Sequence, residues 1–446
     1  MSWPQGTPVA VIGGGLAGCE AAWQLAKRGV RVTLYEMRFT GKDELPPATT
    51  PAHQTGLLAE LVCSNSLKSL ETANAHGLLK AELALLDSLV VGTAKRCAVP
   101  AGKALAVDRG AFARAMTDRI AAQPAIAIEP SEVCDIPAGP TAIASGPLTS
   151  GALAAALSRL FGRDNLFFYD AIAPIVAADS LDLGPLFRGN RNSDDGDYLN
   201  APLTKDQYRA FVAELAAARR HRPHGFEEGR WFEGCLPAEV MAERSKDSLR
   251  FGPMKPVGLF DPREGRRPYA VLQLRRENAA GTMYNLVGFQ TQLARDEQRR
   301  VFGLVPGLER AEYLRYGSMH RNTYLNAPGL LQPTLQAAGR PDLLVAGQLA
   351  GVEGYVESAA MGLLAGINLA RLLRGEPATV PPETTIIGQL ARHVSGGGRG
   401  GYQPMNANFG LLPPLASPVR DKRDRNQAFA GRSLLDLEDW IGNCRN

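Results

Sequence analysis

Two cysteines lie in sequence contexts that suit nucleophilic chemistry. The first, Cys63, belongs to the segment LVCSNSLKS, in which small hydroxyl and amide residues surround the thiol. We expect a helix to begin just after Cys63, capped by Ser64, Asn65 or Ser66, and a helix N-terminus favours the thiolate form. A buried structural cysteine is the alternative interpretation of Cys63.

The second thiol, Cys235, belongs to the segment FEGCLPAEVMAER. We expect a helix to begin near Pro237, because proline suits the first helical position, so Cys235 is also expected beside a helix N-terminus. The chain contains six cysteines but no C-x-x-C pair and no cysteine–histidine cluster with zinc spacing. The pattern therefore predicts neither a metal site nor a disulfide framework.

A glycine-rich turn near the start of the chain predicts dinucleotide binding. An apolar run precedes the turn, an amphipathic helix follows it, and a second strand is expected over 30–35. The turn fits G-x-G-x-x-G and consists of Gly13, Gly14, Gly15, Leu16, Ala17 and Gly18. Its glycines permit a sharp turn, the approach of a pyrophosphate and close helix–strand packing, and the helix N-terminus attracts the phosphates.

Glu36 follows the second strand, about twenty residues after the glycines, where a carboxylate accepts hydrogen bonds from ribose hydroxyls. The same carboxylate repels a 2′-phosphate, so the site suits FAD or NAD better than NADP. The motif leaves open which of the two binds, and a glycine turn that binds nothing is the alternative.

A long helix of small residues is expected from about Glu353, in GVEGYVESAAMGLLAGINLARLL. Its start, at Gly354 and Tyr355, offers a second anion-binding N-terminus, and its small side chains suit packing against a sheet or a flat cofactor. Plain core packing is the alternative interpretation. It explains the middle of this helix better than its first residues.

The middle of the chain differs in character from its two ends. From about Asp179 the chain becomes polar and rich in turns, so we expect it to leave the nucleotide-binding core there. Thr204 and Gln207 predict a capping box, and 269–275 and 282–290 alternate as two strands would.

Length and composition set limits on the class of protein. A chain of 446 residues allows two or three domains, and 45% hydrophobic with 21% charged residues is typical of a globular protein. No apolar run reaches the length of a membrane span and no signal peptide is evident, so we expect a cytoplasmic protein without membrane contact. The net charge of +4 permits a polyanionic partner but does not by itself indicate nucleic acid.

Taken together, these segments resemble the folate-dependent tRNA (uracil-5-)-methyltransferases of the TrmFO family, which are related to the GidA flavoproteins. The resemblance covers nearly the whole chain. It rests on VIGGGLAGCEAAWQLA, ELVCSNSLKS, FEGCLPAEVMAER, RFGPMKPVGL, MHRNTYLNAP and AGQLAGVEGYVESAAMGLLAGINLAR. GidA proteins are longer, with an added C-terminal helical region, and carry a different cysteine segment where this chain has VCSNSLKS.

The resemblance implies an α/β fold: a Rossmann-like FAD-binding domain of the glutathione-reductase and GidA type, with a smaller α/β insertion domain. The FAD-binding domain would comprise residues 1–177 and 325–446, and the insertion domain residues 178–324. FAD would contact the glycine turn, Glu36, Gly354 and Tyr355.

The implied reaction is the reductive methylation of a T-loop uridine in tRNA. The carbon would come from 5,10-methylenetetrahydrofolate, and NAD(P)H would reduce the FAD. We expect Cys235 to add to C6 of the uracil and Cys63 to act near the flavin, although the two roles could be reversed. His320, Arg321 and Tyr355 are the expected folate contacts, and Arg219, Arg220 and Arg222 the expected basic surface for tRNA.

Other readings remain at this point. The chain could be an FAD/NAD(P)H oxidoreductase of a small molecule, a GidA-like wobble-uridine enzyme, or an RNA-binding scaffold that uses FAD structurally. The sequence leaves open whether the protein is a monomer or a homodimer.

Overall fold

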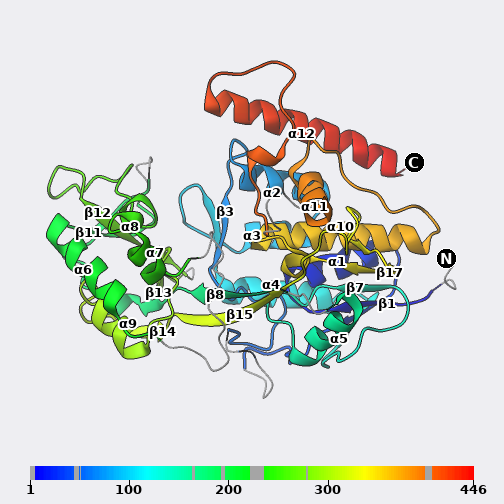
Figure 1. The fold of residues 1–446 in the computed structure, drawn as a ribbon, viewed down its shortest axis with the longest axis horizontal. Coiled ribbons are helices and arrows are strands. Elements are labelled where there is room, and N and C mark those ends of the chain that lie inside the picture. The colour runs from blue at the N-terminus through cyan, green and yellow to red at the C-terminus, as the bar shows by residue number, and fades with distance from the viewer. Residues whose placement is uncertain are drawn as a thin grey trace.

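The computed structural model describes residues 6–44, 50, 52–162, 166–191, 196–220, 236–277, 280–396 and 404–445, with only the backbone described for 166–172, 318–322 and 444–445. The ribbon separates into a larger body and a smaller lobe, drawn at the left of Figure 1. Each part has a hydrophobic core of its own. The core of the larger body contains residues before 158 and after 323, and that of the smaller lobe contains residues from 176 to 308. Domain limits at 177 and 324 stay our proposal.

A six-stranded sheet forms the centre of the larger body, in the order β16-β17-β7-β1-β2-β6. All neighbouring strands are parallel except β16 and β17, which pair antiparallel. The strands are β16 (Gln336–Ala337), β17 (Arg340–Val345), β7 (Thr141–Ile143), β1 (Val9–Ile12), β2 (Val32–Tyr35) and β6 (Ile126–Glu129). This parallel sheet confirms the predicted Rossmann-like class, and strands far apart in sequence, β7 and β17, lie side by side in it.

Helices cover this sheet, and α10 packs along α1 at its centre (Figure 1). Small residues make the contact possible: a Cβ at Gly362 would lie 2.1 Å from the carbonyl oxygen of Ala17. The helices of this body are α1 (Leu16–Lys27), α2 (Ala75–Leu85), α3 (Leu89–Arg96), α4 (Arg109–Ala121), α5 (Gly151–Phe161), α10 (Tyr355–Leu373), α11 (Ile386–Gly396) and α12 (Lys422–Arg445). Of the described helices only α10 is long and apolar enough to cross a membrane, and 78% of its apolar window is buried in the core.

The smaller lobe is built on a second six-stranded sheet, in the order β10-β11-β12-β13-β9-β14, whose pairings are antiparallel. Its strands are β9 (Ile175–Ala177), β10 (Phe187–Arg188), β11 (Leu199–Leu203), β12 (Ala270–Arg276), β13 (Met283–Leu286) and β14 (Tyr313–Arg315). Its helices are α6 (Lys205–Ala217), α7 (Ala238–Arg244), α8 (Ser248–Phe251) and α9 (Arg295–Phe302). The predicted strand pair is thus β12 and β13, and the predicted Thr204–Gln207 capping box is present at the start of α6.

Two further β structures link the parts. A long antiparallel ribbon of β8 (Leu166–Ile172) and β15 (Ser318–Tyr324) runs between the lobe and the body (Figure 1). A small sheet of β3 (Ser66–Ser69), β5 (Ala104–Val107) and β4 (Ala98–Val99) carries the segment that follows Cys63. Short 3₁₀ turns cover Ala178–Ser180, Gly347–Ala350 and Phe409–Leu411.

Candidate functional site

Three glycines of the N-terminal turn are required by packing within the protein itself. Gly13 has φ +103° and a Cβ there would lie 2.6 Å from the carbonyl oxygen of Ala144, at the end of β7. A Cβ at Gly14 would lie 2.5 Å from Leu58, and one at Gly18 only 1.7 Å from the carbonyl oxygen of Gly13. The turn therefore brings β1, β7 and α1 closer together than any side chain allows.

Gly15 has a different environment from the other three. A Cβ at Gly15 would meet no protein atom within 4 Å, although its backbone, φ −74° and ψ −171°, is accessible to any residue. Gly15 is the N-cap of α1 and no side chain caps the helix there. The start of α1 thus borders open space at Gly15, which fits a pyrophosphate that approaches the backbone at this point.

The Glu36 carboxylate helps to hold this turn in place. One of its oxygens accepts a hydrogen bond from the Gly14 amide at 2.8 Å, and the other accepts one from the Arg38 amide at 3.0 Å. The Arg38 guanidinium lies 3.3 Å from the same carboxylate, and both side chains are buried. The hydrogen bonds that we predict from ribose hydroxyls to Glu36 would use the remaining lone pairs of the two carboxylate oxygens.

A small cavity lies beside Glu36, at the carboxyl ends of β1, β2, β6 and β7, where parallel α/β sheets bind their ligands. Its lining includes Ile12, Gly13, Tyr35, Glu36, Met37, Ser131, Glu132, Val133, Ser145, Leu148, Thr149, Ser150 and Leu153. The mixture of apolar and hydroxyl side chains next to a carboxylate suits an adenosine. Ser145 lies two residues after the end of β7.

The Cys63 segment is attached to the first turn of α10. The phenolic oxygen of Tyr355 accepts hydrogen bonds from the backbone amides of Cys63 at 2.7 Å and Ser64 at 3.1 Å. Burial and the neighbouring Cys63 raise the pKa of the Tyr355 phenol, so it remains protonated at neutral pH. Two predicted site residues, 292 positions apart in the chain, are thereby brought together.

Two arginines give this site a positive electrostatic environment. Arg109, at the start of α4, donates hydrogen bonds to the carbonyl oxygens of Leu61 at 2.5 Å and Cys63 at 3.2 Å, and to the Glu277 carboxylate at 2.6 Å. Burial favours a lower pKa for Arg109, but Glu277 and Tyr355 raise it, so the charge is retained. Burial lowers the pKa of Arg315, and so does the nearby charge of Arg109. Arg315 is thus a second guanidinium close to Arg109 and Cys63.

Asn65 anchors the Cys63 segment to the smaller lobe. Its amide nitrogen donates to the carbonyl oxygens of Val107 at 3.0 Å and Arg276 at 2.8 Å, and its amide oxygen accepts from Arg275 at 2.8 Å. Asn65 is fully buried. The thiol segment therefore lies where the body meets the end of β12.

The helix predicted to begin just after Cys63 is absent. Ser66–Ser69 forms β3 instead, with Lys68 at φ +63°, and the next helix begins at Ala75 with Asn74 as its cap. Ser64 and Ser66 accept hydrogen bonds from the amides two residues on, and these local turns compete with a helix. The positive charge beside Cys63 comes from Arg109 and Arg315 rather than from a helix dipole.

Other predicted site residues have a mixed outcome. Cys235 and Arg222 lie outside the described residues, and α7 has Pro237 as its N-cap rather than as its first residue. His320 and Arg321 belong to β15, and their side chains are outside the described part. Arg219 and Arg220 form ion pairs with Asp296 and Glu243, so these two cations are locally neutralised.

Several polar groups around the site were not predicted from the sequence. The buried Glu357 carboxylate accepts hydrogen bonds from His76 at 3.1 Å and from the Ala407 amide at 3.0 Å. Lys80, nearly inaccessible to solvent, donates to the carbonyl oxygens of Leu67 and His76, and burial lowers its pKa to about 8. Helical spacing alone does not distinguish such residues from exposed positions, because their partners come from distant segments.

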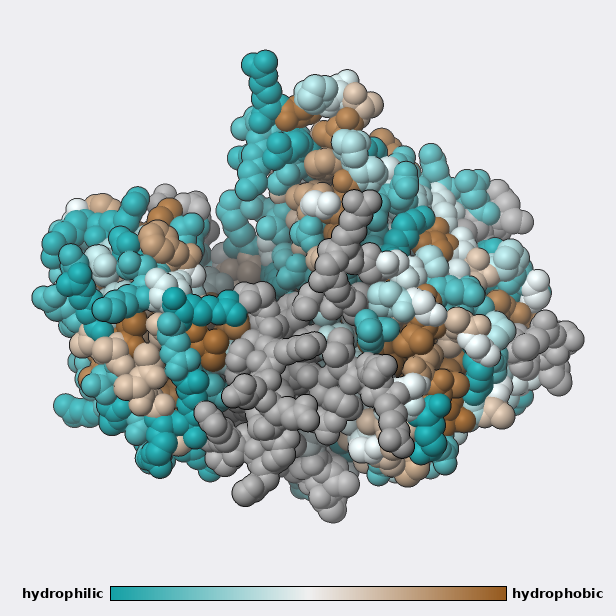
Figure 2. Space-filling view, viewed as in Figure 1, coloured by the Kyte–Doolittle hydropathy of each residue, from teal (hydrophilic) through white to brown (hydrophobic). Residues whose placement is uncertain are grey.

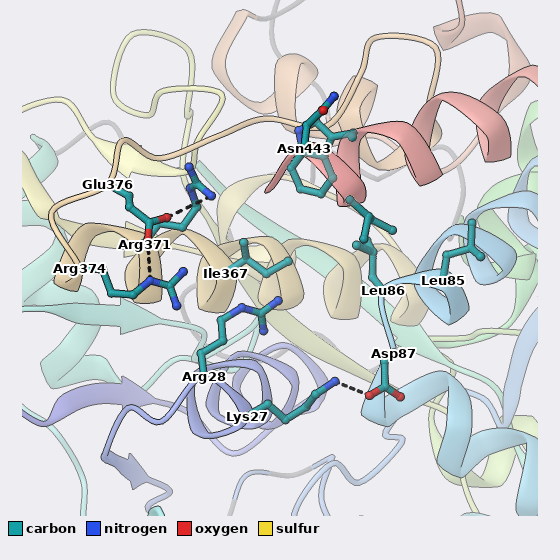
Figure 3. A pocket seen from close by; sticks show the side chains of 12 residues that line it. Lys27, Arg28, Leu85, Leu86, Asp87, Ile367, Arg371, Arg374, Glu376 and Asn443 are labelled. Atoms are coloured by element: carbon teal, nitrogen blue, oxygen red, sulfur yellow. Dashed lines mark hydrogen bonds and ion pairs between the residues drawn. The ribbon is translucent and has the colours of Figure 1, made fainter. Parts of the chain in front are cut away.

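A larger cavity, about 590 Å³, lies where the C-terminal ends of α1, α2 and α10 converge beneath α12 (Figure 3). Its cations are engaged locally: Lys27 pairs with Asp87, and Arg371 and Arg374 both pair with Glu376. Helix C-termini carry partial negative charge, which these cations compensate. None of the predicted cofactor or thiol residues lines this cavity.

A parallel sheet with a glycine turn at its centre, open to a pyrophosphate, defines a Rossmann-type dinucleotide-binding protein. The sequence profile of the family described as "Glucose inhibited division protein A" matches residues 8–377. The chain belongs to this GidA family and, within it, to the group of its TrmFO relatives.

Three curated relatives establish that group, each a "Methylenetetrahydrofolate--tRNA-(uracil-5-)-methyltransferase TrmFO". The protein of Moorella thermoacetica is 55% identical over 96% of both chains. That of Geobacter sulfurreducens is 55% identical over 97% of this chain and 98% of its own, and that of Bacillus subtilis 52% identical over 96% and 98%.

Solved structures agree on the fold. Two crystal forms of Aquifex aeolicus GidA superpose with TM-scores of 0.67 and 0.68 at 16% identity. They cover 99% and 97% of this chain, and 77% and 78% of their own.

Proposed function

We propose that this protein is an FAD-dependent methylenetetrahydrofolate–tRNA (uracil-5-)-methyltransferase that methylates a T-loop uridine. The observation that carries the proposal is the identity of 50–55% to TrmFO proteins along nearly the whole chain. The attachment of the Cys63 segment to Tyr355, in the first turn of the central α10, supports it.

The reaction that we propose balances in atoms and electrons. One carbon passes as a methylene unit from methylenetetrahydrofolate to C5 of the uracil, and one hydride completes the methyl group. The proton lost from C5 and one proton from solvent replace the two C–N bonds at the folate nitrogens, which releases tetrahydrofolate. NAD(P)H is oxidised to NAD(P)⁺ and is the source of the hydride.

FAD, when bound, supplies the hydride-transfer chemistry. The chain would hold its pyrophosphate at the Gly15 amide and the first turn of α1, where a Cβ would find only open space. Its adenosine would lie against Glu36 and the cavity beside it. Gly354 and Tyr355 begin the second helix expected to face the cofactor.

The thiol chemistry divides between two cysteines in our proposal. Uracil C5 is a poor nucleophile, so a thiolate adds at C6 and makes an enolate, and we assign this step to Cys235. Cys63 acts close to the cofactor, where Arg109 and Arg315 stabilise negative charge on a neighbouring group. The reverse assignment predicts the same need for both thiols.

Folate is expected near the same residues. The Tyr355 hydroxyl already accepts two backbone amides, so its ring rather than its hydroxyl oxygen is the part available to a pterin. His320 and Arg321 stay our candidates for the pterin and the glutamate carboxylate. We place the reaction in the cytoplasm, where tRNA is available.

The test is nucleoside analysis of unmodified tRNA after incubation with the purified yellow protein, methylenetetrahydrofolate and NADH. We expect 5-methyluridine in the T-loop, and none when folate is omitted. Bound, reducible FAD without any product would overturn the proposal and direct attention to a small-molecule oxidoreductase.

A further inference from the structure

The smaller lobe carries a groove of about 850 Å³ that shares no lining residue with the cavity beside Glu36. It lies between the start of α6 and the loop that leads into β12. Its charged lining residues are Lys205, Arg250, Arg263, Arg266, Arg267 and Glu264. Five cations and one carboxylate line the groove, and Asp261 behind the lining offsets a further charge by pairing with Arg263.

Part of this charge is not compensated by the protein. Arg263 pairs with Asp261 and Arg266 with Glu264. Lys205 and Arg267 are exposed and form no ion pair with any residue that the structure describes. In the cavity of Figure 3, by contrast, Lys27 pairs with Asp87, Arg371 and Arg374 pair with Glu376, and Arg28 is bonded to Gln24.

Aromatic side chains accompany the cations. The Arg250 guanidinium lies 4.4 Å from the centre of the Tyr269 ring and also donates to the Tyr269 carbonyl oxygen at 3.1 Å, so its position is fixed. Phe251 does not line the groove itself, but its ring lies 5.6 Å from the Arg250 guanidinium and is 72% exposed. Exposed aromatic rings next to arginines are suited to stacking on nucleic-acid bases. In Figure 2 this lobe presents a largely hydrophilic face interrupted by apolar side chains.

The groove is unsuited to a small phosphate ligand at the helix start. Thr204 caps α6 in a closed capping box: its hydroxyl accepts the Gln207 amide, and the Gln207 side chain accepts the Thr204 amide. The helix N-terminus is therefore already satisfied, and the uncompensated charge is carried by side chains spread along an open groove.

The groove and the Cys63 site lie at opposite ends of one strand. β12 begins at Ala270, next to Tyr269, and ends at Arg276, whose carbonyl oxygen is bonded to Asn65. Seven residues of strand span about 20 Å at roughly 3.3 Å per residue. A ligand that contacts both ends has to extend over this length, as a segment of RNA backbone does.

We propose that this groove binds the phosphate backbone of an RNA, at a distance of one strand length from the reacting uridine. The inference rests on the proposed tRNA substrate and assigns a second docking surface to it. Lys205 and Arg267 contact phosphates, which gives affinity without sequence specificity, and Phe251, next to the lining residue Arg250, stacks on an unpaired base.

The experiment measures the dissociation constant of unmodified tRNA for the FAD-loaded protein as a function of salt concentration. The variant is Lys205→Ala/Arg267→Ala, and the matched control is Arg159→Ala/Arg374→Ala, which removes two exposed arginines from the larger body. We expect the groove variant to bind about tenfold more weakly, with a slope of log Kd against log salt reduced by about one to two. The control should match the wild type.

Phe251→Ala separates stacking from charge. It should weaken binding while leaving the salt slope unchanged. If the Lys205→Ala/Arg267→Ala protein keeps the affinity and slope of the control, the groove does not bind tRNA and the inference is overturned. Binding is measured without turnover. If tRNA binding depends on salt and on the groove residues but no 5-methyluridine forms, the proposed reaction is refuted and the docking surface is retained.

Discussion

The phenolic oxygen of Tyr355 lies 2.7 Å from the backbone nitrogen of Cys63 and accepts its hydrogen bond. The same oxygen accepts the Ser64 amide at 3.1 Å. One side chain at the start of α10 thus positions the backbone of the thiol segment, and the geometry of Cys63 depends on a helix almost three hundred residues away in sequence.

Tyr355→Phe should impair catalysis without preventing cofactor binding. It leaves two partly buried amides without their acceptor, at a cost of roughly 1–3 kcal/mol per unsatisfied group, so the Cys63 segment should shift. We expect a lower kcat for 5-methyluridine formation with unchanged FAD content, measured by absorbance and nucleoside analysis.

Tyr313→Phe is the matched control, because the Tyr313 hydroxyl donates only to the Gln298 carbonyl oxygen within the smaller lobe. If both variants lose activity equally, or neither does, the positioning role of Tyr355 is refuted.

Gly15→Ala and Gly18→Ala should fail in different ways. In Gly15→Ala the new methyl group meets no protein atom within 4 Å, so the apoprotein should fold and keep its Tm. The same methyl group would occupy the space expected for the pyrophosphate. FAD affinity should fall by about tenfold or more. The alanine at Gly18 would overlap the Gly13 carbonyl oxygen and should destabilise the protein itself.

Fluorescence titration with FAD and thermal melts of the apoproteins distinguish these outcomes. Wild-type FAD affinity in Gly15→Ala would show that the pyrophosphate does not approach α1 at this residue.

Cys63→Ala should reduce methylation by at least about a hundredfold, the scale of a lost catalytic group. Cys134→Ala, an exposed cysteine of the same body, is the control and should retain activity. Single-turnover formation of 5-methyluridine is the measurement. Normal rates in both Cys63→Ala and Cys235→Ser would refute the two-thiol mechanism.

Glu82 should make stability depend on pH. Its carboxylate is fully buried and accepts hydrogen bonds from the Ile386 and Ile387 amides and from Ser433, yet burial raises its pKa from 4.5 to about 7. Because the folded state holds this proton more tightly than the unfolded state, stability should be greatest below pH 4.5 as far as Glu82 contributes, and fall as pH rises through about 7. The loss is roughly 3 kcal/mol at 1.36 kcal/mol per pKa unit.

Thermal melts at several pH values test this dependence. Glu82→Gln should reduce the fall in Tm between pH 4.5 and 7 relative to the wild type. The control is Glu383→Gln, at an exposed glutamate just before α11, and it should keep the wild-type fall. An unchanged pH profile in Glu82→Gln would mean that other groups cause the fall.

Local patterns predicted a large part of the fold. The βαβ unit, the Thr204 helix cap and the β12–β13 pair are confirmed, because each depends on residues close to one another in sequence. The prediction of a helix after Cys63 is wrong, because the serines and asparagine of this segment suit turns as well as helix caps. Pairing of Ser66–Ser69 with the distant β5 makes the segment a strand.

The sequence by itself determined the class of this protein, since the spacing of the glycines and the family segments is independent of how distant parts pack. Only the tertiary structure decided which residues surround Cys63. Arg109, Arg315 and Asn65 come from separate elements, and Glu277 lies at the far end of β12 from the basic groove. Contacts between residues so far apart in sequence arise from the packing of the body against the lobe, and no local pattern specifies them.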